Sequence, residues 1–299
     1  MQRLLQRFAR KQLRAIGWLR PLMSADAFQA LRYRLWYFER LPREEPLTFT
    51  QRLFRHMARE RSPLLPLTTD KVTMRDYVER VVGPGHLPAL YAVLDAPEAL
   101  RTATLPARYV VKATAGSAMM AFVREDSPAE RERVIRAARP WFRGNHGARY
   151  GEWAYLPLTQ RLVVEEWLAD GEHDVPLDWK FFCFRGEVGI VHLDGNRHGG
   201  PRWRNCYAPD GTPLPGVRLV RPPGPAVPVP AAFPEMARLA ARLSQDFDFV
   251  RVDLYALPGR LVVGELTHYP SKGTQPFTPR EWEERLGELW KRRARSPHA

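Results

Sequence analysis

Residues 251–267 read RVDLYALPGRLVVGELT, with an apolar-rich run on either side of Pro258 and Gly259. Proline and glycine are typical of tight turns, and apolar residues alternate with polar ones in both runs. The stretch therefore predicts a half-buried β-hairpin over residues 249–269.

The spacing within this hairpin brings two carboxylates together. If residues 258–260 form a three-residue turn, Asp253 faces Glu265 and Arg251 faces Thr267. Directly opposed carboxylates repel each other at Cβ separations of about 5 Å. A hard divalent cation removes that conflict, because Mg²⁺ prefers oxygen ligands. We therefore expect Asp253 and Glu265 to hold magnesium.

Two other interpretations of the hairpin stay open. One of the carboxylates could pair with Arg251 instead of a metal. A two-residue turn would shift the register by one residue and separate Asp253 from Glu265.

Lys112 ends an apolar strand over residues 109–113, directly before a loop with Gly116 and Ser117. A lysine in this place could bind a phosphate whose oxygens also accept hydrogen bonds from the loop amides. The alternative is an ordinary lysine at a sheet edge, since one glycine is a weak sign of a phosphate loop.

Lys180 lies in an otherwise apolar strand, where a charge requires a partner or an anionic ligand. Asp178 is two residues away on the same face, so a plain ion pair competes with ligand binding. Glu165 and Glu166 end a valine-rich strand whose backbone could contact the edge of a base. The alternative there is a solvated turn.

The rest of the chain predicts a mixture of helices and strands. We expect helices at 71–82, 87–94, 128–138 and 233–247, and a short one with a basic tail from 279. We expect strands at 109–113, 119–123, 161–168, 179–184 and 188–193, with loops over 205–231.

The composition is that of a globular protein of 299 residues, with 44% hydrophobic and 26% charged residues. Cys183 and Cys206 form neither a disulfide framework nor a metal motif. Neither a membrane-spanning segment nor a secretory signal is recognisable, so we expect a cytoplasmic protein. Residues 1–62 carry fourteen basic and five acidic side chains, most of the net charge of +13. Such uneven charge argues against a nucleic-acid-binding domain.

The first twenty residues predict an amphipathic helix, with apolar residues on one half and basic residues on the other. Such a helix can lie on an anionic membrane surface at the inner face of the membrane. Equally, its apolar face can dock on the rest of the protein.

The order of these motifs along the chain resembles the TupA-like ATP-grasp family. The resemblance covers about residues 66–290, and its last two motifs are the most specific. The segments that carry it are Asp70-Lys71, Arg75 to Val78, Tyr109 to Thr114 with Gly116-Ser117, Glu165 to Leu168, Asp178 to Phe182, Arg251 to Tyr255, and Gly264 to Thr267.

The resemblance implies an α+β ATP-grasp fold, in which a nucleotide lies between two sheets. We accordingly expect a basic helical segment at residues 1–66 and an ATP-grasp domain at 67–299. The implied ligands are ATP and Mg²⁺.

The resemblance also implies roles for individual residues. Lys112 and Lys180 would contact ATP phosphates together with Gly116 and Ser117, and Arg251 would steady the transferred phosphoryl group. Asp253, Glu265 and Thr267 would bind Mg²⁺. The strand end at Glu165, Glu166, Trp167 and Leu168 would hold adenine, and Asp170 or Glu172 would reach the ribose.

The implied chemistry is carboxylate–amine ligation through an acyl phosphate, in the biosynthesis or modification of cell-surface polysaccharides. The basic loop at residues 197–204 could hold an acidic sugar, or could be solvated. Two alternatives are a glycan-assembly protein similar to a glycosyltransferase and a non-catalytic nucleotide-binding protein.

The chain departs from the family in the loop after Lys112. The family commonly has His-Gly-Ser-Gly there, whereas this chain has Ala115-Gly116-Ser117-Ala118. The loop is therefore stiffer and less polar, and Lys272 could supply a compensating charge.

Overall fold

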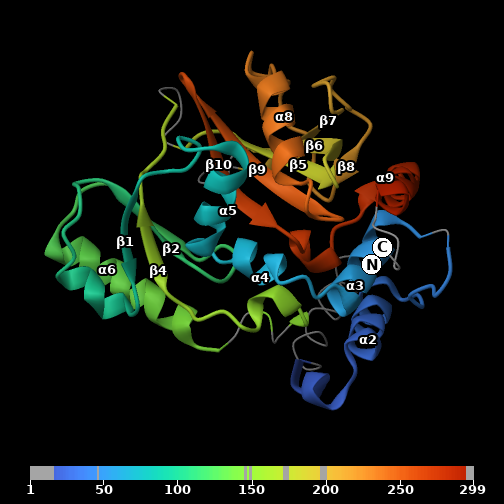
Figure 1. Ribbon diagram of the computed structural model, residues 1–299, viewed down its shortest axis with the longest axis horizontal. Helices are drawn as coiled ribbons and strands as arrows, with labels where there is room; N and C mark the ends of the chain where they lie inside the picture. The colour runs from blue at the N-terminus through green and yellow to red at the C-terminus, as the bar shows by residue number, and fades with distance from the viewer. Residues whose placement is uncertain are drawn as a thin grey trace.

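A computed structural model describes residues 17–45, 47–144, 147, 150–170, 175–195 and 201–293. They form an α+β fold with two larger antiparallel sheets and helices around them (Figure 1). The predicted helix over residues 1–20 lies mostly outside the described residues, and Gly17–Leu22 is a 3-10 helix, η1. Among the described residues, every helix is too short or too polar to serve as a membrane-spanning segment.

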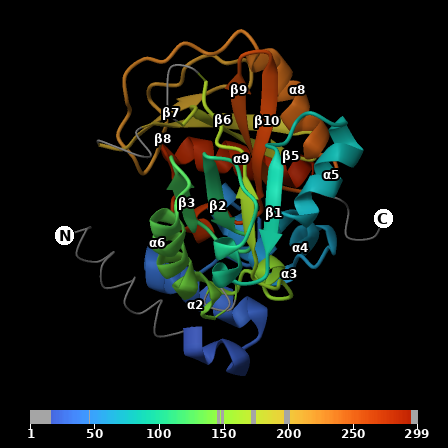
Figure 2. The same cartoon turned by 90° about the vertical axis from the view of Figure 1, so that its left-hand side faces the viewer.

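The first sheet has four strands in the order β1-β4-β2-β3. Its strands are β1 (Leu90–Leu94), β2 (Tyr109–Ala113), β3 (Met120–Val123) and β4 (Leu162–Glu165). Val111 and Val164 pack on one face against α6 (Pro128–Ala138) and η2 (Pro97–Arg101). Because side chains alternate along a strand, Lys112 and Glu165 lie on the opposite face, which is turned toward the second sheet (Figure 2).

The expected helix at residues 87–94 is wrong, because Leu90–Leu94 is strand β1. This strand pairs antiparallel with β4, a partner that follows it by about seventy residues. Strand pairing between segments this far apart in sequence overrides the weak local helix preference of a short apolar segment.

The second sheet has five strands in the order β10-β9-β5-β6-β7. They are β5 (Asp178–Phe184), β6 (Glu187–Gly195), β7 (Trp203–Tyr207), β9 (Val250–Leu257) and β10 (Arg260–Thr267). One face packs on α8 (Phe233–Leu243), where the Phe233 ring lies 5.5 Å from that of Phe181. The other face is covered at one end by α3 (Phe49–Arg59) and α9 (Arg280–Arg293) and borders a cavity at the other end.

The β9–β10 hairpin has a different turn from the expected one. Leu257 pairs with Arg260, so the turn contains only Pro258 and Gly259. A β-bulge between Val263 and Glu265 then adds one residue to β10, and the ladder regains the expected register. As a result Asp253 does face Glu265 and Arg251 faces Thr267.

Helices α2 (Ala25–Tyr37), α3, α4 (Leu64–Thr69) and α5 (Thr73–Val82) precede the first sheet. A capping box between Thr48 and Gln51 starts α3. The Phe49 ring lies 5.1 Å from Phe249 and 5.7 Å from Trp290, so α3 belongs to the core of the second sheet. The expected division at residues 66/67 stays a prediction.

The remaining elements are short. They are η3 (Arg139–Phe142), η4 (Trp153–Tyr155), η5 (Pro270–Gly273), and the two-stranded sheet of β8 (Arg218–Leu219) and β11 (Phe277–Thr278). The expected loop over 205–231 therefore includes β8 and the end of β7, and the expected helix over 233–247 ends at Leu243.

Candidate functional site

One row of residues crosses all five strands of the second sheet. Directly paired residues of antiparallel strands point to the same face, so their side chains lie side by side. From β10 to β7 the row is Glu265, Asp253, Lys180, His192 and Cys206. The sheet register thus places Lys180, Asp253 and Glu265, three of the predicted site residues, next to one another.

Lys180 and Asp253 are the buried centre of an ion-pair network. The Lys180 ammonium donates to Asp253 and, at 2.6 Å, to Asp178. Arg251 donates to both oxygens of Asp253, at 2.6 and 2.7 Å, and to the Thr267 hydroxyl at 3.0 Å. Burial opposes ionisation of Asp253, but the charges of Arg251 and Lys180 outweigh it and lower the pKa of Asp253. Both ion pairs left open by the sequence are therefore present.

His192 continues the row as a neutral group. It is buried, and its imidazole ring lies 5.2 Å from that of Phe182. Burial first, and then the charges of Arg204 and Arg251, lower the pKa of His192 well below its usual value. His192 therefore adds no positive charge to this row at neutral pH.

Glu265 differs from Asp253 in its contacts. It is half-buried, and within the described part of the chain its carboxylate has no hydrogen-bond or ion-pair partner. Both of its oxygens are available to a ligand.

The donor set fits magnesium only together with further oxygen ligands. A carboxylate offers about four lone-pair positions, and the three bonds from Arg251 and Lys180 leave about one open on Asp253. Among the described residues, no group of three or more His, Cys, Asp or Glu side chains is suited to a metal ion. Mg²⁺ is commonly held by one or two carboxylates plus substrate phosphates, and Asp253 with Glu265 matches that arrangement.

The wall opposite this row comes from the first sheet and its β2–β3 loop. Lys112 donates to Glu165 at 2.7 Å, and Gly116 and Ser117 lie in the loop beyond β2. Gly116 has φ +140°, and a Cβ there would lie 2.8 Å from the Met119 sulfur. The backbone conformation thus favours glycine at this position, whereas the flexible Met119 side chain could move away from a Cβ.

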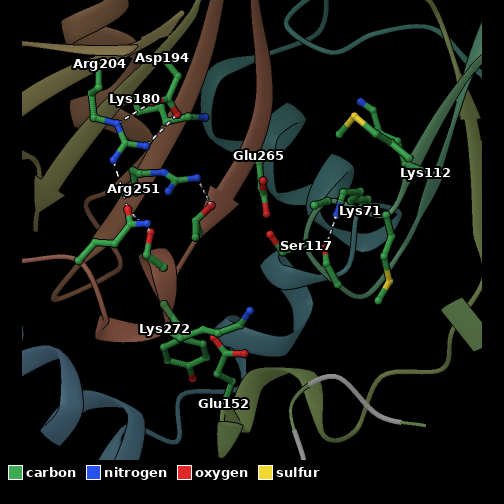
Figure 3. Close-up of a pocket in the computed structure, with 18 of the residues that line it drawn as sticks. Lys71, Lys112, Ser117, Glu152, Lys180, Asp194, Arg204, Arg251, Glu265 and Lys272 are labelled. Carbon is green, nitrogen blue, oxygen red and sulfur yellow. Dashed lines mark hydrogen bonds and ion pairs between the residues drawn. The ribbon is translucent and has the colours of Figure 1, made fainter. Parts of the chain in front are cut away.

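A cavity of about 260 Å³ separates the two walls. Eight of the described residues that line it are lysine or arginine, and three are acidic. Figure 3 shows Lys71 and Lys112 on one side, Arg251 and Arg204 on the other, and Lys272 with Glu152 below. This excess of positive charge favours an anionic ligand.

A smaller cavity of about 80 Å³ shares Lys71, Lys112 and Glu265 with the larger one. Its other lining is mostly apolar and includes Val110, Phe122, Leu168, Pro176 and Tyr255. A largely apolar pocket beside a cationic one suits a ligand with a flat ring system and an anionic tail.

The strand end predicted to hold adenine is only partly at this smaller cavity. Glu166 and Leu168 line it, although the Glu166 carboxylate also binds Arg260 at 3.0 Å. Trp167 does not line it, and its ring lies 4.7 Å from that of Phe122. Glu165 contacts Lys112 and lines neither cavity.

Other predicted ligand-binding residues lie away from both cavities or outside the described chain. Asp170 lines neither of them. Glu172 and residues 197–200 of the basic loop lie outside the described residues, whereas Arg202 and Arg204 of that loop line the larger cavity.

Several lining residues were absent from the predicted site, and Lys71, Asp194 and Glu152 are the charged ones with the clearest contacts. Lys71 reaches the cavity from the α4–α5 connection, and its ammonium donates to the Gly116 carbonyl at 3.4 Å. Asp194 on β6 accepts hydrogen bonds from Arg204. Glu152 is buried, and burial raises its pKa to about 7, although Lys272 and Arg32 oppose the shift. Only the Asp70-Lys71 motif gave any signal in the sequence.

Comparison with solved structures finds ATP-grasp and related ligases at low identity. D-cycloserine synthetase DcsG is 17% identical with a TM-score of 0.45, over 82% of this chain and 77% of that one. D-alanine–D-alanine ligase from Helicobacter pylori is 11% identical with a TM-score of 0.47, over 77% and 60%. The Bacillus anthracis enzyme, complexed with ATP, is 13% identical with a TM-score of 0.40, over 68% and 55%.

The chain thus spans only about half to two thirds of the length of several of these structures. Comparison with curated proteins finds no match. A sequence model of the family described as TupA-like ATPgrasp matches residues 51–291, which is most of the chain and includes both sheets and the cavity between them. The predicted family and the α+β ATP-grasp fold are therefore confirmed, and the chain belongs to the TupA-like ATP-grasp family.

Proposed function

We propose that this protein is an ATP-dependent carboxylate–amine ligase. The observation that carries the proposal is the cavity between the two sheets, because cationic side chains enter it from both sides. Lys112 comes from the first sheet, and Lys180 and Arg251 come from the second. Opposed cationic walls suit a polyphosphate and the charge that develops during phosphoryl transfer.

The nucleotide fits with its adenine in the smaller cavity and its phosphates in the larger one. Val110, Phe122 and Leu168 offer apolar surface to a base. Lys112, which lines both cavities, lies where the phosphates would begin, and Gly116 and Ser117 are further along the larger cavity. Lys180 would meet the phosphates from the opposite wall.

Magnesium would be held where the two cavities meet, by Glu265, which lines both, and by the remaining position on Asp253, which lines the smaller one. The Thr267 hydroxyl lies beside them. When bound, the ion would neutralise phosphate charge and orient the phosphates. Arg251 holds Asp253 in place from the same strand and is available to steady the transferred phosphoryl group.

The proposed reaction has two steps. A substrate carboxylate attacks the γ-phosphorus of ATP, the bond to ADP breaks, and an acyl phosphate forms. An amine then attacks the acyl carbon, phosphate leaves, the nitrogen loses a proton, and an amide remains. The chain's residues position the reactants and stabilise negative charge in both steps.

An acidic sugar of a cell-surface polysaccharide is the proposed carboxylate substrate. The support from the structure is the set of arginines Arg202, Arg204 and Arg221 on the β7–β8 side of the larger cavity. Contact of residues 1–20 with an anionic membrane stays a prediction, and it fails if deleting them leaves liposome binding unchanged.

The decisive experiment measures ADP release with MgATP, a panel of uronic acids and a panel of amino acids. We expect release to require one member of each panel, and hydroxylamine to trap the acyl phosphate as a hydroxamate. Glu265→Gln should abolish release, whereas the exposed Lys291→Met should not. Failure of the wild-type protein to bind MgATP in calorimetry would contradict the proposal.

One observation favours a second candidate, a non-catalytic nucleotide-binding protein. Asp253 is already neutralised by Arg251 and Lys180, which weakens its attraction for a cation. Binding of ATP with the same affinity with and without magnesium, and without ADP release, would support this second function.

A further inference from the structure

Helix α2 lies before the region that matches the family, yet it contacts the loop that follows the β9–β10 hairpin. Three of its side chains donate hydrogen bonds to three successive carbonyls of that loop. These are Arg32 to Lys272 at 3.1 Å, Tyr37 to Gly273 at 2.6 Å, and Trp36 to Thr274 at 3.2 Å. One helix face thus holds the loop backbone residue by residue.

The loop needs such support because its backbone is strained. Ser271, Lys272 and Gly273 have φ values of +50°, +58° and +74°. Two of the three are not glycine, and the left-handed conformation is sterically unfavourable for a residue that has a Cβ. Such a conformation persists only when its surroundings determine it, and it is common at functional sites.

Helix α2 is itself firmly held. Arg32 is fully buried and also donates to the side chain of Gln29 at 2.6 Å and to the Tyr150 carbonyl at 2.7 Å. Tyr33 packs edge-on against Phe54 of α3, with ring centroids 5.2 Å apart. The hydrogen bonds from α2 to the loop therefore come from a helix that is itself held in position.

What the loop presents to the cavity is the ammonium group of Lys272. This group lies 4.3 Å from the Tyr150 ring centroid and forms no ion pair with a described residue. In Figure 3, Lys272 points up into the cavity from below, between the two cationic walls. On its other side the loop is tied to the sheet, since Ser271 donates to Gln275, which accepts from Arg204.

We propose that helix α2 is a positioning element that holds the Ser271–Gly273 turn in its left-handed form, so that Lys272 binds an anionic group of the reactants. That group is a phosphoryl or a carboxylate oxygen. The identity of the ligand rests on the proposed ligase function, whereas the positioning role of α2 does not.

The positioning role is tested by hydrogen–deuterium exchange of the full-length protein. Tyr37→Phe and Trp36→Phe each remove one hydrogen bond to the loop, and Tyr91→Phe is the matched control on an exposed tyrosine. We expect amides in residues 271–275 to exchange about 5-fold faster in the first two variants and unchanged in the control. Unchanged exchange in both α2 variants overturns the proposal.

The role of Lys272 is tested by a double-mutant cycle with Tyr37→Phe and Lys272→Met. The probes are the magnesium complex of a non-hydrolysable ATP analogue and D-glucuronate, each titrated by calorimetry. Tyr37→Phe should weaken one probe about 3- to 10-fold in the wild-type background and have no further effect beside Lys272→Met. The probe that responds identifies the group as phosphoryl or carboxylate.

Equal weakening of binding in both backgrounds would show that Tyr37 does not act through Lys272, and would overturn the proposal. If neither probe binds the wild-type protein, the ligase function and the assignment of Lys272 fail together. The exchange experiment then still decides whether α2 holds the loop.

Discussion

Asp253 and Glu265 face each other across the β9–β10 hairpin, but only Asp253 is ion-paired within the described part of the chain. Arg251 and Lys180 neutralise Asp253, so the two carboxylates do not repel each other as two bare charges would. The pair therefore has unequal tasks: Asp253 organises the buried cations, and Glu265 is open to the cavity.

This difference in ion pairing predicts that two conservative substitutions affect different properties, one the stability of the protein and the other its nucleotide binding. Asp253→Asn removes the carboxylate shared by two buried cations and should lower the free energy of unfolding by about 3 kcal/mol. Glu265→Gln should change it by less than about 0.5 kcal/mol, but abolish magnesium-dependent nucleotide binding. Urea unfolding and calorimetry measure the two effects, and equal destabilisation by both variants would contradict the assignment.

Lys112 should matter for nucleotide binding more than for folding. Its partner Glu165 also lies 3.7 Å from Arg75, so Lys112→Met leaves that buried carboxylate with a cation. We expect MgATP affinity to fall about 10- to 100-fold, which is typical for a lost charged hydrogen bond. Lys291→Met, on the exposed face of α9, is the control in the same titration. An unchanged affinity of Lys112→Met would remove this residue from the site.

The raised pKa of Glu152 predicts a pH-dependent stability. Between its usual pKa of 4.5 and its folded value of about 7, the folded protein keeps a proton that the unfolded chain has lost. The free energy of unfolding should therefore fall as the pH rises through this range, by about 3 kcal/mol in total.

Glu152→Gln should abolish this contribution, because glutamine does not titrate. Relative to wild type, the variant should gain about 2–3 kcal/mol between pH 5 and pH 8. Chemical unfolding at both pH values measures the gain, with the exposed Glu281→Gln as control. A constant difference between wild type and Glu152→Gln would contradict the predicted shift.

Gly273 should tolerate substitution less well than another glycine with positive φ. A Cβ at Gly273 would lie 2.6 Å from the Phe54 ring, whereas a Cβ at Gly85 meets nothing within 4 Å. Gly85→Ala should cost about 1 kcal/mol from backbone strain alone, and Gly273→Ala about 2–4 kcal/mol. Thermal unfolding of both variants gives the comparison, and equal costs would show that the contact with Phe54 is unimportant.

The sequence predicted those parts of the fold that depend on local pattern or on the order of motifs. The helix at 128–138, the strand at 109–113 and the pairing of Asp253 with Glu265 are present. The strand at 90–94 was missed, because its partner β4 is distant in sequence and five residues carry little periodicity.

The cavity was predicted only in part for the same reason. Asp194 and Glu152 lie in segments without a recognisable motif, and the folded chain alone brings them to the cavity that Arg204 of the basic loop also lines. The hydrogen bonds from α2 to residues 272–274 span more than 230 positions, so no local pattern could indicate them.

The bulge beside Gly264 has a consequence for how this hairpin can vary in length. A three-residue turn without a bulge and a two-residue turn with one both bring Glu265 opposite Asp253. A residue deleted next to Gly259 can therefore be absorbed by flattening the bulge. The outer end of the hairpin is free to lose a residue during evolution, while the half that carries Asp253 and Glu265 keeps its alignment.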